Sequence, residues 1–499
     1  DVSSIKLWRG RYVPVRIGRH VCWFFGTIHP AYMLHMQGVR DERRLSGDDW
    51  HYAFRRDLRR VQGDLDRLPD APEPEAPERA RDDIHIVLPG DEKGWASLED
   101  MVNRAISRRP LVPLTVDIET RRLRPYSERA CILSASVADG STCFAFALDH
   151  PEARLSTDSR RRTIALLRKV CLSPVQKCAH KAEFELEWLA WLLGPDVVEA
   201  SLWHDTMAQA YCLDERADGL DLDFLCRWRF GLALKQLNPV DVAHLDREPL
   251  GEVLWYNAMD AKYEARLFQL QDEELTRQGL QKVYHDQLER IPTVVLAQRI
   301  GLVVDVAEAK ALQDRYSVRI GKLLKAIHAD RDVARYERQC GAFNPLSVPQ
   351  LTRFLRDFLK APQGRRGKGY STDDAALEAI GTPIAGMIRE LRSLSKVRST
   401  YIDGLLPGGA DIYPDGRLHT SFKTMVTGTR RLASEGPNMQ NWPQRTEEHR
   451  MVRRAIRAPD GQVLVAADYK QIEAVVIACA SGDRYFCDAL WQNYDVHSY

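Results

Sequence analysis

The sequence lacks long apolar runs, paired-cysteine motifs and any strong excess of charge. No stretch approaches the ~18 consecutive apolar residues of a membrane span, and no signal peptide opens the chain. The ten cysteines form no C-x-x-C pair, so we expect reduced thiols and neither a zinc site nor disulfides. With 71 basic and 70 acidic residues, the net charge of +1 does not by itself indicate a polyanionic partner.

The composition, with 44% hydrophobic and 28% charged residues, is typical of an ordinary globular protein. A chain of 499 residues predicts about three domains. It opens on Asp1 without an initiator Met, so we expect a piece of a longer reading frame. Residues 69–80 are rich in Pro, Glu and Ala, which predicts an extended, semi-rigid linker over 69–82 after a small N-terminal unit.

Hydrophobic periodicity beyond this linker predicts a multi-domain α/β protein. Strands are predicted at residues 114–116, 131–138 and 142–147, and helices at 163–171 and 184–193. This order is typical of a mixed α/β layer. From about residue 285 the pattern becomes mainly helical. The predicted elements there are helices at 306–329, 348–359 and 383–405 and strands at 418–423 and 463–467.

Two acidic segments of the first half contain carboxylates that could lie together in one site. Asp117 and Glu119 lie at the end of a strand, and alternation puts both side chains on one face. Glu185 shares a helical face with leucines four and seven residues further on, where a carboxylate needs a cation or a hydrogen-bond partner. Glu183 and Glu187 point the opposite way, and solvent alone is expected to satisfy them.

A third segment adds Tyr256 and Asp260, which lie four residues apart on one helical face. Four carboxylates from a strand and two helices, with a phenol beside one, suit two divalent cations. The all-oxygen ligand set favours Mg²⁺ or Mn²⁺. Taken singly, each acid is more often structural, and only the combination favours a site for phosphodiester chemistry.

Residues 111–270 resemble the DnaQ/ribonuclease-H-like 3′–5′ exonuclease domain of DNA polymerases. The resemblance rests on Asp117-Ile118-Glu119, on the segment 179–185, and on Tyr256 with Asp260. It implies that Asp117, Glu119, Glu185 and Asp260 hold metal and that Tyr256 assists. The family usually has Asn where Lys181 stands and Asp where Glu185 stands. Residues 204–207 resemble a further element of that family, with an expected structural role.

Basic residues gather in the second half. Arg389, Arg392, Lys396 and Arg398 line one predicted helix and suit a duplex backbone. A second group suits phosphates, although a solvated charged surface is the alternative. This second group comprises Lys423, Arg430, Arg431, Arg445, Arg450, Arg453, Arg454 and Arg457.

Residues 285–499 resemble family A DNA polymerases, with a thumb over 285–410 and the start of a palm over 411–499. The elements occur in the family's order, in segments 343–347, 370–373, 399–401, 427–441 and 468–473. The remaining parts of the family, including the second catalytic Asp, are expected beyond Tyr499. We therefore expect no polymerase activity from these residues alone.

This resemblance implies roles for single residues. Asp468 is implied as a metal ligand, with the backbone carbonyl of Tyr469 assisting, and Glu473 as the steric gate against the ribose 2′-hydroxyl. Departures from the family pattern are Arg430 in place of Gly and Val475 in place of Arg. The other implied substrate-binding residues are Arg431, Asn438, Gln440, Gln471 and, near the incoming triphosphate, His497.

Residues 27–34, with His29, resemble the C-terminal end of uracil-DNA glycosylases of the family 4 type. By this resemblance residues 1–68 are a glycosylase-like remnant of small α/β form, and His29 would stabilise negative charge on the departing base. A chance His-Pro turn before a helix is the alternative. His35 stands where that family commonly has Arg.

The favoured interpretation is a replication and repair enzyme with an exonuclease domain over 83–275. Expected partners are primer-template DNA, single-stranded 3′ ends and deoxynucleoside triphosphates, with two Mg²⁺ or Mn²⁺ ions per active site and no membrane. The expected location is the cytoplasm, at a nucleoid or as a viral protein in a host. The alternatives are a stand-alone DNA exonuclease and a non-catalytic DNA-binding scaffold.

Overall fold

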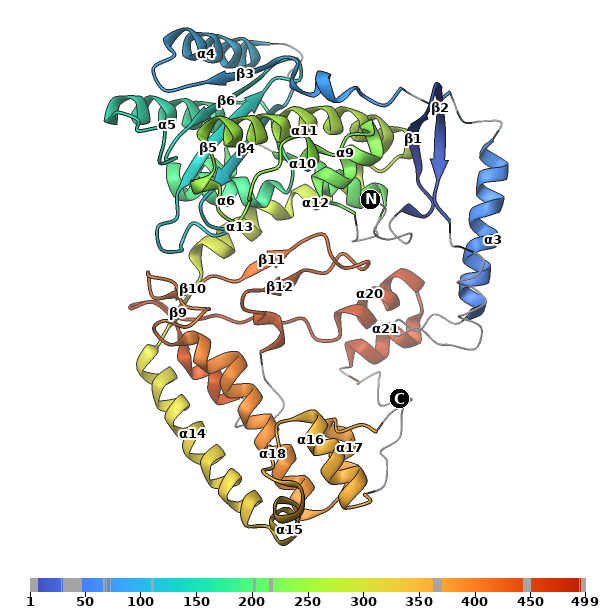
Figure 1. Cartoon of the computed structure of the whole chain (residues 1–499), viewed down its shortest axis with the longest axis vertical. Helices are drawn as coiled ribbons and strands as arrows, with labels where there is room; N and C mark the ends of the chain where they lie inside the picture. Colours follow the sequence, from blue (N-terminus) through green and yellow to red (C-terminus); the bar gives the residue numbers. More distant parts are fainter. Residues whose placement is uncertain are drawn as a thin grey trace.

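The structure is a computed structural model, and its upper and lower parts differ in architecture (Figure 1). The upper part is a β-sheet covered by helices, and the lower part is mainly helical. In the described part of the chain, no helix has the length and apolar character to cross a membrane. The residues that the structure describes are 8–27, 29, 47–65, 68, 70–71, 73–108, 112–200, 203–214, 219–361, 370–442, 450–492 and 494.

A six-stranded sheet forms the centre of the upper part, in the order β3-β6-β5-β4-β7-β8. The neighbours β6, β5 and β4 are antiparallel, whereas β3 pairs with β6, β7 with β4, and β8 with β7 in parallel. The strands are β3 (Ile84–Val87), β4 (Leu114–Thr120), β5 (Ile132–Ala138), β6 (Cys143–Ala147), β7 (Lys177–Ala179) and β8 (Trp203–Asp205).

Helices cover both faces of this sheet, which is why all seven residues of β5 are buried. The two faces differ in residue size. Along β6, the small residues Cys143, Ala145 and Ala147 share a core cluster with α11, so this long helix can lie close to the sheet. Phe144 and Phe146 alternate with them and belong to the cluster of α4 and α5. The helices of the upper part are α4 (Glu92–Ser107), α5 (Thr157–Leu172), α6 (Ala182–Leu193), α7 (Asp196–Glu199), α8 (Thr206–Leu213), α9 (Leu222–Phe230), α10 (Leu234–Leu237), α11 (Leu250–Gln278), α12 (Gln281–Leu288) and α13 (Arg290–Ile300).

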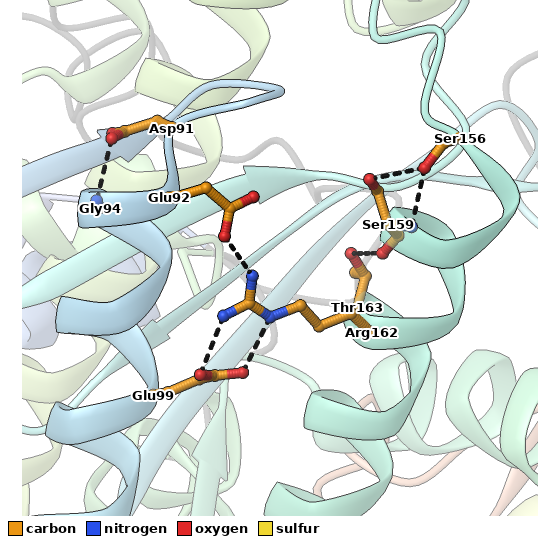
Figure 2. A network of polar contacts seen from close by, with 8 residues as sticks. All are labelled: Asp91, Glu92, Gly94, Glu99, Ser156, Ser159, Arg162 and Thr163. Carbon is orange, nitrogen blue, oxygen red and sulfur yellow. Dashed lines mark hydrogen bonds and ion pairs between the residues drawn. The ribbon is translucent and has the colours of Figure 1, made fainter.

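The two helices α4 and α5 are joined by one arginine (Figure 2). Arg162 on α5 donates through Nε and Nη2 to the two carboxylate oxygens of Glu99 at 3.0 Å, and through Nη1 to Glu92 at 2.8 Å. Ser156 caps the start of α5 by accepting from the backbone N–H of Ser159 at 3.0 Å. These contacts fix one outer layer of the sheet.

The N-terminal hairpin of β1 (Tyr12–Ile17) and β2 (His20–Phe25) packs on α9. Arg11 lies 4.7 Å from the ring centroid of Trp228 and pairs with Asp214 at 3.0 Å. The indole Nε1 of Trp228 donates to the backbone carbonyl of Tyr12 at 3.1 Å. The hairpin therefore shares the core of the sheet region. Helix α3 (Gly47–Asp64) follows it, at the right in Figure 1.

The Pro-rich segment is docked on the upper part, and the expectation of an extended linker is wrong for Pro77–Arg81, which form a 3₁₀ helix. Glu75 accepts from the hydroxyl of Tyr263 at 2.8 Å, and its backbone N–H donates to Phe230 O at 3.0 Å. Ala80 is buried in the same core as α9. The Pro-, Glu- and Ala-rich composition of the segment predicted that it would not join a core. Contacts with α9 and α11 nevertheless hold it in place.

The lower part is built on α14 and α18, which pack together along their length. Helix α14 has the bounds that the sequence predicted. The other two predicted helices are composite, because a π-helix continues α16 over Arg353–Phe358 and another continues α18 over Arg398–Ile402. The helices are α14 (Val306–Ala329), α15 (Arg331–Cys340), α16 (Val348–Thr352), α17 (Asp374–Ile380) and α18 (Pro383–Val397).

Short strands connect the two parts. A three-stranded sheet has the order β10-β9-β13, and β11 pairs with β12. The strand predicted at 418–423 is therefore divided between β10 and β11. These strands are β9 (Leu302–Val304), β10 (Arg417–Leu418), β11 (Ser421–Lys423), β12 (Ala433–Glu435) and β13 (Ile456–Arg457).

The predicted buried strand at 463–467 is wrong. These residues have no strand structure, and Val463 and Val465 are 81% and 86% exposed. Apolar β-branched residues form a strand only where a neighbouring strand satisfies their backbone groups, and no described strand lies beside them. Helices α20 (Ile472–Ser481) and α21 (Arg484–Trp491) follow and pack on each other.

Candidate active sites

The first acidic segment lies within β4, between β5 and β7. Asp117 is opposite Ser136 on β5 and is 8% exposed, and Glu119 is half-buried two residues further on. The side-chain amide of Asn257, from α11, donates a hydrogen bond to Asp117. The structure thus places both carboxylates on one strand against α11, as the alternation predicted.

Glu185 comes from the first turn of α6 and is 3% exposed. Its Oε2 atom is buried and has no hydrogen-bond partner among the residues that the structure describes. The N-cap of the helix is Lys181, whose φ of 72° lies in the left-handed region. Asp205 accepts from the backbone N–H groups of Lys181 and Ala182 at 3.1 and 2.9 Å. These bonds fix the start of α6.

Asp205 also caps the next helix. It accepts from the backbone N–H groups of Met207 and Ala208, at 2.8 and 3.1 Å, where α8 begins. One buried carboxylate therefore holds the starts of α6 and α8 together. These contacts support the structural role predicted for residues 204–207.

Tyr256 and Asp260 are one turn apart on α11, which packs across β4, β5 and β6. The Tyr256 hydroxyl donates a hydrogen bond to Asp260. Burial, countered by Lys235 and by this bond, raises the pKa of Asp260 to about 7. Repulsion from Asp260, then burial, raises the pKa of Tyr256. The phenol therefore stays protonated and can hold the carboxylate.

The four predicted carboxylates act on one another electrostatically. Burial, followed by the charge of Asp260, raises the pKa of Asp117 well above its ordinary value. Burial and the charges of Asp117, Asp260 and Glu185 do the same for Glu119. The pKa of Glu185 is raised by burial and by Asp117. Binding of a divalent cation requires deprotonated carboxylates, so the raised pKa values make cation binding weaker at lower pH.

The chemistry of these side chains fits hard divalent cations. All the candidate ligand atoms are carboxylate oxygens, which Mg²⁺ and Mn²⁺ prefer, and the unpartnered Oε2 of Glu185 requires a positive partner. In the described part of the chain, no group of three or more His, Cys, Asp or Glu side chains is arranged so that it could hold a metal ion. The charges of these carboxylates act on one another, so a bound cation would have to bring them closer together.

Three carboxylates near this site were missed or misread from the sequence. Glu183 and Glu187 were expected to face solvent, but they are 4% and 2% exposed. Arg124 pairs with Glu187 at 2.9 Å, and the hydroxyl of Thr424 donates to Glu183 at 3.3 Å. The second face of α6 is covered by α13 and by the segment after β11. Glu264, the third, lies one turn beyond Asp260 and is also buried.

The second candidate site, around Asp468, is open to solvent. Asp468 is exposed, and Tyr469 is 80% exposed. Glu473 lies in the first turn of α20 and forms an ion pair with Arg431, both side chains being 70% exposed. Gln471 has a φ of 52°, and its side-chain amide donates to Tyr494 O at 3.4 Å. The structure brings Arg431 and Glu473 together but leaves Asp468 uncovered.

The amides of the 427–441 loop are used within the loop itself. The Asn438 side chain accepts from the Ser434 hydroxyl and from the Asn441 backbone N–H, both at 3.1 Å. The Gln440 side chain donates to Leu432 O at 3.0 Å. In this structure these two residues therefore shape the loop.

Arg430, which replaces the usual Gly, ties this loop to the upper part. Its φ is 60°, a conformation that favours Gly. Its Nη2 donates to Val283 O at 2.8 Å, and Arg290 donates to Arg430 O at 2.8 Å. Tyr211 on α8 donates to Thr427 O at 2.6 Å. The strained residue is thus held by hydrogen bonds across the joint between the two parts.

Two predicted residues have little structural context. His29 is exposed, and its neighbours Ile28 and Pro30 lie outside the described residues. His497 also lies outside the described residues. Their predicted roles stay predictions.

Two regions of the chain match protein families. Residues 95–275 match the family described as 3′–5′ exonuclease, and residues 296–499 match DNA polymerase family A. Over these two regions the chain is similar to the class of family A DNA polymerases with a 3′–5′ exonuclease region.

The individual relatives agree with this class. DNA polymerase I of Chloroflexus aurantiacus is 30% identical over 429 residues, which are 81% of this chain and 42% of that protein. DNA polymerase I of Pseudomonas aeruginosa is 30% identical over 447 residues, 85% of this chain and 46% of that protein. The chain thus spans less than half the length of these curated relatives.

A solved structure shares the fold. The structure titled "POL domain of Pol1 from M. smegmatis complex with DNA primer-template and dNTP" aligns with a TM-score of 0.63 and 23% identity. The alignment covers 83% of this chain and 66% of that one.

Proposed function

We propose that residues 83–275 form a ribonuclease-H-like 3′–5′ exonuclease domain that removes nucleotides from single-stranded DNA ends with Mg²⁺ or Mn²⁺. The observation that carries this proposal is the set of carboxylates from β4, α6 and α11, of which Asp117 and Glu185 are buried and Glu119 and Asp260 are half-buried. Buried carboxylates without cationic partners are costly, and they persist where a metal or a substrate requires them.

The residues of this site have two kinds of role, holding cations and positioning the carboxylates. Asp117, Glu119, Glu185 and Asp260 would hold two cations, which polarise the scissile phosphate and stabilise both the attacking and the leaving oxygen. Tyr256 fixes Asp260 through its hydroxyl. Asn257 fixes Asp117 from the same helix. The frayed 3′ end of a strand enters such a site more easily than a paired end, so single-stranded DNA is the preferred substrate.

We propose further that residues 285–410 are a thumb and 411–499 the start of a palm, which bind primer-template DNA and deoxynucleoside triphosphates. In this assignment Asp468 and Tyr469 take a metal, Glu473 is the steric gate, and Arg431 meets the primer-template. Asn438, Gln440, Gln471 and His497 belong to the same substrate-binding set. Because Asp468 lies in an exposed, unpaired segment, we expect no measurable primer extension by the 499-residue chain. Extension of a primed template by the purified chain would contradict this.

The remaining assignments rest on sequence alone. Residues 1–68 are proposed as a uracil-DNA glycosylase-like remnant, with His29 at the base, and residues 69–82 as the connection to the exonuclease domain. A cytoplasmic location, at the nucleoid or in a viral host, suits a DNA polymerase. Release of uracil from a uracil-containing oligonucleotide, lost in His29→Ala, tests the first of these.

An exonuclease assay tests the main proposal. We expect Mg²⁺-dependent shortening of a 5′-labelled single strand, reduced by roughly 10²- to 10³-fold in Asp117→Ala and Asp260→Ala, since each removes several kcal/mol of charge stabilisation. Chelation of the metal abolishes the activity of the wild type. Asp468→Ala is the matched control, because it removes a carboxylate elsewhere.

Equal degradation by the wild type and Asp117→Ala would show that these carboxylates are wrongly assigned. The outcome also separates the alternatives. A stand-alone exonuclease loses no activity when residues after 411 are altered, and a scaffold shows no Mg²⁺-dependent activity at all.

A further inference from the structure

A fifth carboxylate, Glu264, lies within electrostatic reach of three of the four that the exonuclease assignment uses. Glu264 is on α11, four residues after Asp260, so the two side chains lie on the same helical face. It is 1% exposed. The negative charges of Asp117, Glu185 and Asp260 all act on it. No polymerase or exonuclease role discussed above uses this residue.

The two oxygens of this carboxylate have different environments. The backbone N–H of His180, just before the start of α6, hydrogen-bonds the Glu264 carboxylate. The Oε2 atom is buried, and no described residue forms a hydrogen bond with it. A purely structural glutamate needs only the first contact. An unpartnered oxygen beside three other carboxylates is costly unless a cation is drawn toward it.

We propose that Glu264 is an additional cation-holding residue of the exonuclease centre, with one oxygen fixing the turn before Glu185 and the other facing the divalent cations. The proposal rests on the exonuclease assignment and deepens it, since it makes the centre a five-carboxylate site. Its bond to the turn also links the position of Glu185 to α11, because His180 immediately precedes Lys181, the N-cap of α6.

Mn²⁺ binding to the full chain, measured by calorimetry without DNA, tests this. Glu264→Gln keeps an oxygen for the His180 N–H but loses the charge, so we expect Mn²⁺ affinity to fall by about 10-fold or more. The metal-free variant should melt no lower than the wild type, because a source of repulsion among buried carboxylates is gone. Glu264→Asp restores the charge on a shorter arm and should recover part of the affinity.

Glu183→Gln is the matched control. Glu183 is equally buried on α6, but it faces Thr424 rather than the cluster, so its neutralisation should leave Mn²⁺ affinity within about twofold. Unchanged Mn²⁺ affinity in Glu264→Gln would overturn the proposal, and so would an equal loss in Glu183→Gln. Asp117→Ala separates the two levels of the argument. If Asp117→Ala binds Mn²⁺ as tightly as the wild type, the exonuclease assignment fails. If Asp117→Ala loses affinity but Glu264→Gln does not, only the role of Glu264 is refuted.

Discussion

The two acidic sites of this chain use the same kind of side chain in opposite environments. Asp117 and Glu185 are 8% and 3% exposed and come from a strand and a helix that helices cover on both sides. Asp468 lies in an exposed segment without strand structure, although its sequence also resembles a family motif. A motif therefore names residue types, while the surrounding elements decide whether a site is assembled.

The largest effect is expected from a change on the face of α6 that carries Glu187, opposite Glu185. Arg124→Ala leaves Glu187, 3% exposed, without its ion-pair partner. We expect a loss of about 3 kcal/mol in the free energy of unfolding, because a buried charge remains uncompensated. Urea denaturation measures this. Exonuclease activity should fall as well, since Glu185 lies on the same helix.

A surface pair gives the matched control for this prediction. Arg161 and Asp158 form an ion pair with side chains that are 76% and 93% exposed, so Arg161→Ala should cost less than about 0.5 kcal/mol. The double variant Arg124→Ala with Glu187→Gln should regain much of the lost stability. Equal effects of Arg124→Ala and Arg161→Ala on the free energy of unfolding would show that the Arg124–Glu187 ion pair does not hold α6 in place.

Local signals explain what the sequence could predict. The bounds of α14 were predicted correctly, since Asp305 caps the helix by accepting from the Glu308 N–H at 3.0 Å, and that signal lies within four residues. The strand-end carboxylates Asp117 and Glu119 likewise follow from alternation along β4.

The errors came from contacts between segments far apart in the sequence. A helix that is covered on two faces gives no clear polar stripe, so Glu183 and Glu187 were misread as exposed. The segment 463–467 has a strand's composition but no described neighbour to pair with. Glu264 was overlooked because its role depends on the turn at His180, 84 residues earlier by its number in the chain.

A smaller effect is expected at the loop that carries Arg431. Arg430→Ala removes the hydrogen bond to Val283 O and keeps a side chain at a φ of 60°, so it should cost about 1–2 kcal/mol. Arg430→Gly loses the same bond but relieves the strain, and it should be more stable than Arg430→Ala by roughly 1 kcal/mol. Thermal denaturation of both variants checks the order. The reverse order would show that the left-handed conformation is not held in solution.

The smallest effect is expected at Asp468. Since its side chain is exposed and its segment makes no strand pairing, Asp468→Ala should change the free energy of unfolding by less than about 0.5 kcal/mol. Exonuclease activity should equal that of the wild type, in contrast to Asp117→Ala. Val465→Thr should also change the free energy of unfolding by less than about 0.5 kcal/mol. Val465 is 86% exposed, so the substitution takes little apolar surface out of a core. A loss above about 1 kcal/mol in either variant would mean that the segment packs against other residues in solution. Both Asp117 and Asp468 would then lie in packed surroundings. The two sites would differ only in the residues or ligands that contact each carboxylate.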